Sequence, residues 1–390
     1  MVDDNPSPGG QIWRGGGGRT GQQLAALREG VRVISQAQVI AADPVARTVM
    51  VNAPTGPSTV RWNRLIIATG SRELFLPFPG WTLPGVFGAG GLQALAKSGL
   101  PVDGKRVVVA GSGPLLLAVA KYLKSRGARI LAIVEQAGFG ALVRFGAGLM
   151  RYPEKLIEAS RLKAGLAGIS YRMGCWIEAA DGSDQLRSVR LRSGSKSWTE
   201  QCDFAAVGFG LYPNTELASL LGCGFRDGRV RVDELQETSV AGIYCAGEAT
   251  GIGGVELAEC EGAIAGSAAA GDFDSARGYF EDRERLQGFA RSLENAFRLR
   301  PELKQLPSDD TFICRCEDVR WARVRNAGSW REVKLHTRCG MGPCQGRVCG
   351  PAVEYLRGWR PESVRPPIFP APVGSLMSVR EFEDCEVMER

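Results

Sequence analysis

Histidine is almost absent from this chain of 390 residues, since His336 is its single histidine. Catalytic zinc sites built on two or three histidines are therefore excluded. A Ser-His-Asp triad would depend on this one residue and is not expected. In the segment VKLHTR the histidine alternates with apolar residues, which predicts a strand position and a surface or hydrogen-bonded side chain instead of a metal ligand.

Long apolar runs and a secretion signal are missing as well. No apolar segment approaches the ~18–20 residues of a transmembrane helix, and MVDDNPSPGG has neither the basic nor the apolar part of a signal peptide. Cysteine makes up about 3% of the chain, far below the ~8–10% of a disulfide scaffold. The eleven cysteines, an odd number without a signal peptide, predict a reducing cytoplasm.

The composition is that of a globular protein, with 44% hydrophobic and 23% charged residues, and the length predicts two or three domains. The net charge of +6 is concentrated in residues 311–360, which hold ten Lys or Arg and four Asp or Glu. A basic segment is typical of nucleic-acid binding and equally of the surroundings of an anionic cofactor. Five cysteines lie in the same stretch and favour the cofactor, so no nucleic-acid partner is expected.

Residues 105–135 predict one βαβ half of a doubly wound sheet. Gly111 permits the tight turn after the first strand, and Gly113 lets a pyrophosphate approach the N-terminus of the following helix. Glu135 ends the second strand, where a ribose hydroxyl is bound. Leu116 occupies the third glycine position of the motif. The pattern therefore leaves two alternatives open, which are a site for NAD(P) or another adenine nucleotide and a purely structural unit.

The remaining segments have simpler patterns. Residues 31–60 predict two antiparallel strands, residues 65–67 a short buried strand, and residues 186–233 mixed β structure. The segment 242–254 predicts a strand and a glycine-rich turn before a helix of small residues, and residues 274–306 predict a helical linker.

The cysteines of the basic segment read CRCEDVRWARVRNAG and then TRCGMGPCQGRVCG. Four thiolates can hold a [2Fe–2S] cluster. Cys316 and Cys349 each precede a predicted helix, whose N-terminus stabilises thiolates. A zinc site made of four cysteines is the alternative, but structural zinc usually uses pairs of cysteines two to four residues apart. The spacing therefore favours the cluster over zinc.

Three motifs resemble those of flavoproteins with two dinucleotide-binding domains. They are VDDNPSPGGQIWR, the turn Ala68-Thr69-Gly70, and AGEATGIGG, in which Glu248 stands where the family has Asp. The family's GxGxxG loop is not found before Val2, so the resemblance implies a fold whose first βαβ unit is missing. It implies FAD as a cofactor, with these contact residues: Asp3 or Asp4, Gly10, Gln11, Thr69, Gly70, Gly247 and Glu248. The related disulfide reductases need a redox-active CxxxxC pair near the flavin. No cysteine precedes Cys175 in this chain, so disulfide reductase activity is not expected.

The pattern CxCE followed by GMGxCQGRxC resembles the bacterioferritin-associated-ferredoxin-like module, in the version fused to multi-subunit amine and amino-acid flavin dehydrogenases. The chain as a whole resembles the A (α) subunits of opine oxidase, hydrogen cyanide synthase and related dehydrogenases. The resemblance implies Cys314, Cys316, Cys344 and Cys349 as cluster ligands, with Cys339 as a spare candidate. It also implies an α/β flavoprotein fold with a small α-rich C-terminal domain. The expected segments are 1–100 with 226–272 for FAD, 101–225 for NAD(P), 273–310 as linker, and 311–390 for the cluster.

The activity implied by this resemblance is electron relay in a multi-subunit dehydrogenase or oxidase that acts on CH–NH donors. A separate β subunit would carry the FAD that oxidises the substrate, and a further small ferredoxin-like subunit is a second candidate partner. No residue of this chain is expected to act as a general base. Two alternatives remain, namely a self-contained NAD(P)H-dependent reductase using Gly111 to Glu135, and a non-catalytic Fe–S scaffold without its own flavin.

Overall fold

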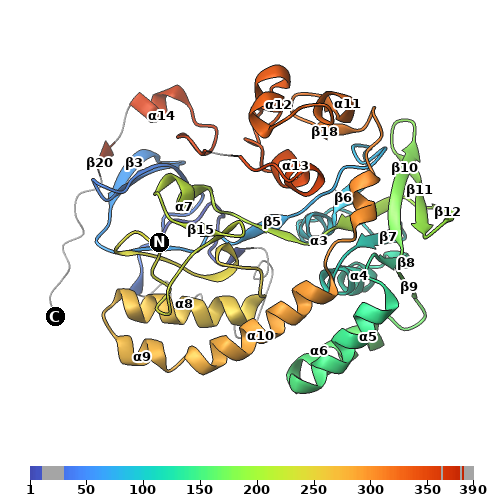
Figure 1. Ribbon diagram of the computed structural model, residues 1–390, viewed down its shortest axis with the longest axis horizontal. Helices are drawn as coiled ribbons and strands as arrows, with labels where there is room; N and C mark the ends of the chain where they lie inside the picture. The colour runs from blue at the N-terminus through green and yellow to red at the C-terminus, as the bar shows by residue number, and fades with distance from the viewer. Residues whose placement is uncertain (11–29, 362, 378–379, 382–390) are drawn as a thin grey trace. The chain divides into compact units, whose positions relative to one another are not determined.

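The computed structural model describes residues 1–10, 30–361, 363–377 and 380–381 (Figure 1). The chain divides into two compact units. The first unit comprises Met1–Ser71, Pro213–Glu284 and Glu362–Arg390, and the second Arg72–Tyr212 and Arg285–Pro361. This division by contacts is not the same as the four segments expected from the sequence, which stay a prediction.

The second unit is built on a five-stranded parallel sheet in the order β6-β13-β7-β8-β9. Val107, Val108 and Val109 in β7 are fully buried because helices and strands cover both faces. The predicted strand, turn, helix and strand of residues 105–135 are confirmed. The elements are β6 (Val86–Gly88), α3 (Ala89–Lys97), β7 (Arg106–Gly111), α4 (Leu115–Ser125), β8 (Arg129–Glu135), β9 (Ser170–Met173) and β13 (Phe204–Gly208).

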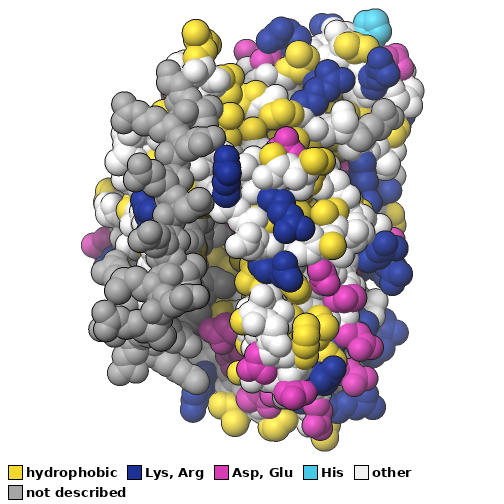
Figure 2. Space-filling model, turned by 90° about the vertical axis from the view of Figure 1, so that its left-hand side faces the viewer, with side chains coloured by type: hydrophobic (Ala, Val, Ile, Leu, Met, Phe, Trp, Pro, Cys, Tyr) yellow, Lys and Arg dark blue, Asp and Glu magenta, His cyan; other side chains and the backbone are white. Residues whose placement is uncertain are grey.

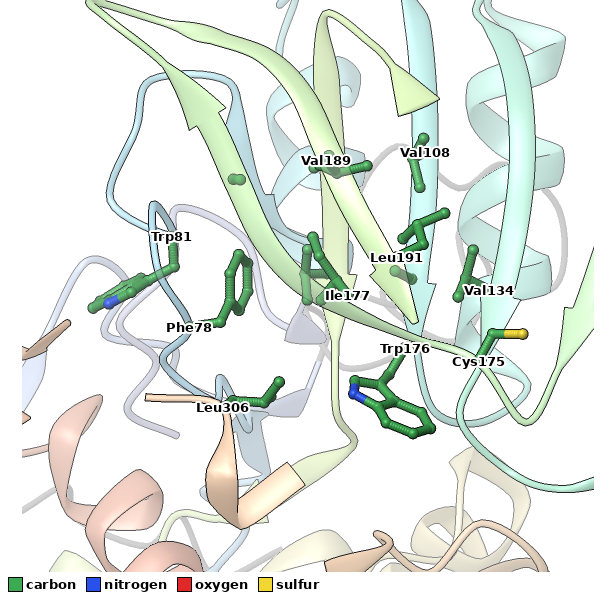
Figure 3. Close-up of a cluster of buried hydrophobic side chains, with 14 of the residues drawn as sticks. Phe78, Trp81, Val108, Val134, Cys175, Trp176, Ile177, Val189, Leu191 and Leu306 are labelled. Carbon is green, nitrogen blue, oxygen red and sulfur yellow. The ribbon is translucent and has the colours of Figure 1, made fainter. Parts of the chain in front are cut away.

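An antiparallel three-stranded sheet covers one side of this parallel sheet. It consists of β10 (Trp176–Gly182), β11 (Leu186–Ser193) and β12 (Lys196–Gln201). Figure 3 shows Ile177 and Leu191 of this sheet facing Val108 and Val134 of the parallel strands. The mixed β structure expected in this region is therefore confirmed, and burial of these apolar faces holds the two sheets together.

The second unit also contains helices that precede and follow β9 in the sequence. They are α5 (Phe139–Gly148), η1 (Leu149–Arg151), α6 (Pro153–Gly165), the part of α10 (Phe280–Ala296) from Arg285 onward, and η3 (Pro301–Gln305). The ring of Phe145 in α5 lies 6.2 Å from Phe289 and 5.4 Å from Phe297, between centroids. The helical linker expected after residue 274 is thus present, and its second half packs onto α5 through aromatic contacts.

The cysteine-rich segment forms a small module of the second unit, shown in orange and red in Figure 1. A short hairpin precedes its helices, and Trp330, Val333 and Val353 lie in its own hydrophobic core. The elements are β18 (Phe312–Cys314), β19 (Val319–Arg320), α11 (Trp321–Val324), α12 (Trp330–Thr337) and α13 (Cys349–Arg357).

Two expectations for this module are wrong. His336 lies in α12 and not in a strand, because Trp330 and Val333 are buried at a helical spacing and Ser329 caps the helix by accepting the Glu332 N–H at 3.2 Å. Cys316 does not directly precede a helix, since β19 separates it from α11. Cys349, in contrast, is the first residue of α13 as expected.

The first unit holds antiparallel and parallel strands. Residues 31–60 form three antiparallel strands and not two, because the turn at residues 54–55 is followed by another strand. Leu65–Ile67 pairs with Ile243–Cys245 in parallel. The elements are β1 (Gln38–Asp43), β2 (Thr48–Ala53), β3 (Gly56–Arg61), β4 (Leu65–Ile67), α7 (Glu216–Leu220), β15 (Phe225–Arg226), β16 (Arg229–Val230), β17 (Ile243–Cys245), η2 (Gly247–Ala249), α8 (Val255–Ala269), α9 (Phe273–Arg277), α14 (Val373–Met377) and β20 (Arg380–Glu381).

Two short strands, β5 (Ser71–Glu73) and β14 (Leu211–Pro213), lie where the chain passes from one unit to the other. Among the helices of the described residues, none combines the length and the apolar character needed to cross a membrane.

We expect Gly111→Ala to destabilise the second unit. A Cβ at this position would lie 1.8 Å from the Gly208 carbonyl oxygen, and the φ of +142° is one that side chains rarely adopt. The expected loss is about 2–4 kcal/mol in the free energy of unfolding, measured by urea denaturation. Gly146→Ala in α5 is the matched control, since a Cβ there meets nothing within 4 Å and alanine favours the helix. Equal stability of the two variants would contradict the close approach.

Candidate cofactor sites

Three cysteines from different elements meet in the core of the cysteine-rich module. The Sγ atoms of Cys314, Cys339 and Cys349 all lie within 4.8 Å of one another, and all three residues are buried. Cys314 ends β18, Cys339 follows α12, and Cys349 begins α13. Such a group of convergent sulfurs is the donor set that iron–sulfur clusters and zinc prefer.

The other two cysteines of the segment lie on the more open side of this group. Cys316 is exposed and Cys344 is half-buried, and the backbone N–H of Cys344 hydrogen-bonds to the sulfur of Cys316. Gly342 lies against Cys316, because a Cβ at Gly342 would be 2.3 Å from the Cys316 Cβ. The absence of a side chain at Gly342 therefore allows the loop to approach Cys316.

The three buried thiols shift one another's pKa. Hydrogen bonds from Cys339 and Cys349 lower the pKa of Cys314 to about 2. The same hydrogen bond to Cys314 raises the pKa of Cys339 to about 12, and contact with Cys314 also raises the pKa of Cys349. One thiolate is thus stabilised by two thiols, and a metal that binds there would displace their protons.

The residues present therefore fit a sulfur-ligated metal centre. The structure brings together two of the expected ligands, Cys314 and Cys349, and adds Cys339 as their buried neighbour. Cys316 and Cys344, the other two expected ligands, lie next to each other at the open side. The sequence motif gives Cys339 only as a spare candidate. Its one signal there is its place directly before Gly340 in the cysteine-rich loop.

The glycine turn of the second unit has the geometry of a dinucleotide-binding loop. Gly111 and Gly113 have positive φ angles of 142° and 97°. The carboxylate of Glu135 accepts the Gly113 N–H at 2.8 Å and the Ala137 N–H at 2.8 Å. Glu135 is 1% exposed, and its burial raises its pKa to about 7. The three residues expected from the motif are therefore close together, but both Glu135 oxygens already have backbone partners.

The segment after α10 is tied to this loop. The Ser112 hydroxyl donates to the Phe297 carbonyl at 3.0 Å, and the Gln136 amide donates to the Ser112 hydroxyl at 2.9 Å. The Arg300 N–H donates to the Gln136 side chain at 3.1 Å. The linker is therefore part of the structure around the glycine turn.

The first unit brings two of the expected flavin-contact turns together. The parallel pairing of β4 and β17 places the turns after both strands at one edge, and the Ser71 hydroxyl donates to the Glu248 carboxylate. The Thr69 hydroxyl donates to the Asn214 carbonyl at 2.6 Å, and Gly70 has a φ of +64°. Helix α8 begins after these turns without a side-chain cap on its N-terminal N–H groups, which are donors suited to an anionic group.

The acidic start of the chain lies in the same unit. Asp3 follows a parallel bridge between Val2 and Ile34, and its carboxylate accepts the Asn5 N–H at 2.8 Å. Asp4 is exposed and accepts the Asn5 amide at 2.7 Å. Gly10 is exposed with a φ of +63°. Gln11 lies outside the described residues.

Sequence reasoning missed one buried acid beside the second turn. Glu261 in α8 is 4% exposed and accepts the Gly247 N–H at 2.9 Å and the Thr250 hydroxyl at 2.8 Å. Its signal in the sequence is an acid within a helix of small and apolar residues. It fixes the turn that carries Gly247 and Glu248.

Comparison with known proteins decides the family. Residues 4–265 match the pyridine nucleotide-disulphide oxidoreductase family. The chain belongs to this family of oxidoreductases. It is 31% identical to the A subunit of opine oxidase from Rhizobium meliloti (strain 1021), over 98% of this chain and 93% of that protein. It is 30% identical to the HcnB subunit of hydrogen cyanide synthase from Pseudomonas aeruginosa, over 97% of this chain and 93% of that protein.

A solved structure supports the fold along nearly the whole chain. L-proline dehydrogenase from P. horikoshii superposes with a TM-score of 0.67 at 19% identity, covering 96% of this chain and 73% of that one. The resemblance drawn from the motifs and the two-dinucleotide-binding fold class are confirmed.

We expect the stability of this protein to depend on the ionisation of Glu135. The folded chain keeps a proton on Glu135 up to about pH 7 because burial raises its pKa, whereas the unfolded chain releases the proton near the ordinary value of 4.5. The folded state therefore binds more protons in this window, and its stability falls as pH rises through it. Relative to Glu135→Gln, the wild type should lose on the order of 3 kcal/mol between about pH 4.5 and pH 7.

Urea denaturation of both proteins across this range measures the difference. The two proteins are compared by how their free energy of unfolding changes with pH and not by its absolute value. Glutamine has one acceptor oxygen where glutamate has two, so the variant also loses a partner for one of the two backbone N–H groups. Parallel stability curves for the two proteins would show that Glu135 is not buried as described.

Proposed function

We propose that this protein is an electron-relay subunit of a multi-subunit, flavin-dependent amine or amino-acid dehydrogenase or oxidase that acts on CH–NH donors. Electrons would pass through FAD and a [2Fe–2S] cluster held by this chain. The observation that carries the proposal is the gathering of Cys314, Cys339 and Cys349 in one buried group, with Cys316 and Cys344 beside it.

The similar proteins support the substrate class and the partner. Two of them are named as subunits, of opine oxidase and of hydrogen cyanide synthase. We infer that this chain also works with a second, FAD-containing subunit that oxidises the substrate, and that a small ferredoxin-like subunit is a further candidate partner. We assign no general base for substrate to this chain. The cofactors would supply the redox chemistry and this chain their positions and electrostatic surroundings.

The first unit offers the groups that would hold FAD. Asp3 or Asp4 would bind the ribose, and the turns that contain Gly70 and Gly247 would border the cofactor, together with Gly10, Gln11, Thr69 and Glu248. The uncapped N-terminus of α8 supports this proposal, since its N–H groups favour an anion. Bound FAD would convert between two-electron and one-electron transfer, which a cluster alone cannot do.

A second candidate function is NAD(P)H-dependent reduction by this chain alone. The positive φ angles of Gly111 and Gly113 and the nearby Glu135 favour a nucleotide at the second site. The carboxylate would have to exchange a backbone partner for a ribose hydroxyl, so we rank this function below electron relay.

Purification distinguishes these functions. Electron relay predicts a second flavoprotein chain that co-purifies, with dye reduction driven by an amine or amino acid only when both chains are present. A self-contained reductase predicts dye reduction with NADH or NADPH by this chain alone. A scaffold without flavin predicts cluster absorption and no flavin band near ~450 nm. Zinc in place of iron in anaerobically purified protein would refute the proposal.

Cysteine variants test the cluster. The expected ligand set predicts that Cys314→Ser, Cys316→Ser, Cys344→Ser and Cys349→Ser each lose most of the bound iron and the visible absorption, because four thiolates hold the cluster. Cys339→Ser should keep both. Iron analysis and absorption of anaerobically purified protein give the result.

Cys175→Ser is the matched control. Cys175 is buried in the same unit, outside the module, and its Sγ donates to the Met173 carbonyl at 3.3 Å, a bond that serine can also form. Loss of iron in Cys339→Ser together with full iron in Cys316→Ser would replace the expected ligand set with one that contains Cys339.

A further inference from the structure

The outer face of α12 carries an exposed basic ridge, defined as Arg331, Lys334, Leu335 and Arg338. Arg331, Lys334 and Leu335 are exposed residues of the helix, and Arg338 is its exposed C-cap residue in the left-handed conformation, whereas Trp330 and Val333 of the same helix are buried. Leu335 is 69% exposed at the centre of the ridge. In Figure 2, Lys and Arg side chains gather near the single histidine, which is drawn in cyan and belongs to the same helix.

The basic ridge leads directly to the open side of the cysteine group. The Arg338 guanidinium donates to the Glu317 carboxylate at 2.8 Å, and Glu317 follows the exposed Cys316. Met341 is 42% exposed in the loop whose Gly342 lies against Cys316. One continuous surface therefore joins basic side chains, two exposed apolar side chains and the least buried sulfur of the group.

Two of the three cations of the ridge, Arg331 and Lys334, have no ion-pair partner among the described residues. Within the described part of the chain, neither Arg331 nor Lys334 has a carboxylate within 4.0 Å. Glu332 is on the same helix, but it accepts the Gly328 N–H at 2.8 Å. Glu317 and Arg338 neutralise each other, so the unpaired positive charges of the ridge are those of Arg331 and Lys334. The ridge therefore presents a positive field at the edge of the proposed cluster.

We propose that the basic ridge and the adjoining loop with Met341 are the docking surface for a small acidic protein that carries a one-electron redox centre. The inference rests on the proposed function for its electron-transfer part. Opposite charges would steer and orient the partner, and Leu335 and Met341 would form the apolar centre of the contact. The reduced cluster would give one electron to the partner's oxidised centre and return to its own oxidised state. Electrons from a two-electron donor would leave in two such transfers.

The position of the ridge favours this partner over other anionic ones. Nucleic acid or an anionic membrane would also bind Arg and Lys side chains. Binding of a nucleic acid or a membrane does not require that the basic surface lie beside the exposed Cys316 of the proposed cluster site. A protein acceptor needs both features, because its own centre must come close to the cluster.

Charge reversal at Arg331 and Lys334 tests the proposal. The oxidised chain is mixed in a stopped-flow instrument with a reduced, acidic plant-type ferredoxin, so that one electron passes from the ferredoxin cluster to the cluster of this chain. We expect the second-order rate of the Arg331→Glu/Lys334→Glu variant to fall about tenfold or more at low salt, and the rate to lose most of its dependence on ionic strength. Binding of the oxidised ferredoxin, measured by biolayer interferometry, should weaken in parallel.

The controls separate docking from cluster assembly. Arg161→Glu/Lys163→Glu makes the same charge change on exposed positions of α6 and should leave the ferredoxin rate unchanged. Reduction by methyl viologen radical, which needs no docking, and the iron content should be the same in all three proteins. If the chain holds no cluster, its spectrum shows this and the proposed function fails, while the interferometry still decides whether the ridge binds an acidic protein.

Three outcomes would overturn the docking surface. The first is an unchanged ferredoxin rate and affinity in the ridge variant. The second is equal or tighter binding of cytochrome c, which is basic. The third is tighter binding of a DNA duplex or of phosphatidylserine vesicles than of the ferredoxin, lost in the same variant, which would assign the ridge to that polyanion.

Discussion

The close approach of three buried thiols is the constraint on which the cysteine-rich module depends. Sulfurs within 4.8 Å of one another cannot all be ionised without a cation, because like charges at that distance in a buried site repel strongly. Hydrogen bonds from Cys339 and Cys349 lower the pKa of Cys314, while the pKa of each of the other two thiols is raised, which favours one thiolate beside two thiols. The loop glycines Gly340 and Gly342 make the approach possible, since a Cβ at either would meet Trp330 or Cys316 at less than 3.0 Å. The fold thus places the sulfurs, and a metal would remove the need for the protons.

The sequence predicted the regular part of the fold well. In β7, an uninterrupted apolar run between Arg106 and Gly111 specifies a strand buried on both faces, and Gly111 specifies the turn after it. Local patterns of this kind reflect local physics. The strand expected for His336 was wrong. Alternation over six residues is too short a pattern to outweigh the helical spacing of Trp330 and Val333 and the cap at Ser329.

The candidate sites were predictable only in part, because they depend on contacts between distant residues. The motif named Gly113 and Glu135, and the structure brings them within hydrogen-bond distance. It gave no sign that Ser112 would bond to Phe297, which is 185 positions away. Nor does the spacing of the cysteines reveal that the Sγ atom of Cys339 lies within 4.8 Å of the Sγ atom of Cys314. Such proximity is set by how α12 packs on the module core, which a linear pattern does not contain.

The segment between α10 and η3 forms hydrogen bonds both to the glycine turn at Gly111 and to the cysteine-rich module. The Phe297 carbonyl accepts the Ser112 hydroxyl of the glycine turn, and three residues later the Arg300 carbonyl accepts the Tyr355 hydroxyl of α13 at 2.6 Å. Since α13 begins at Cys349, four linker residues join the glycine turn to the cysteine group. The Trp81 indole adds a second anchor by donating to the Phe312 carbonyl in β18 at 2.7 Å. Movement of the glycine turn would therefore strain hydrogen bonds that reach α13, which couples the glycine turn to the cysteine module.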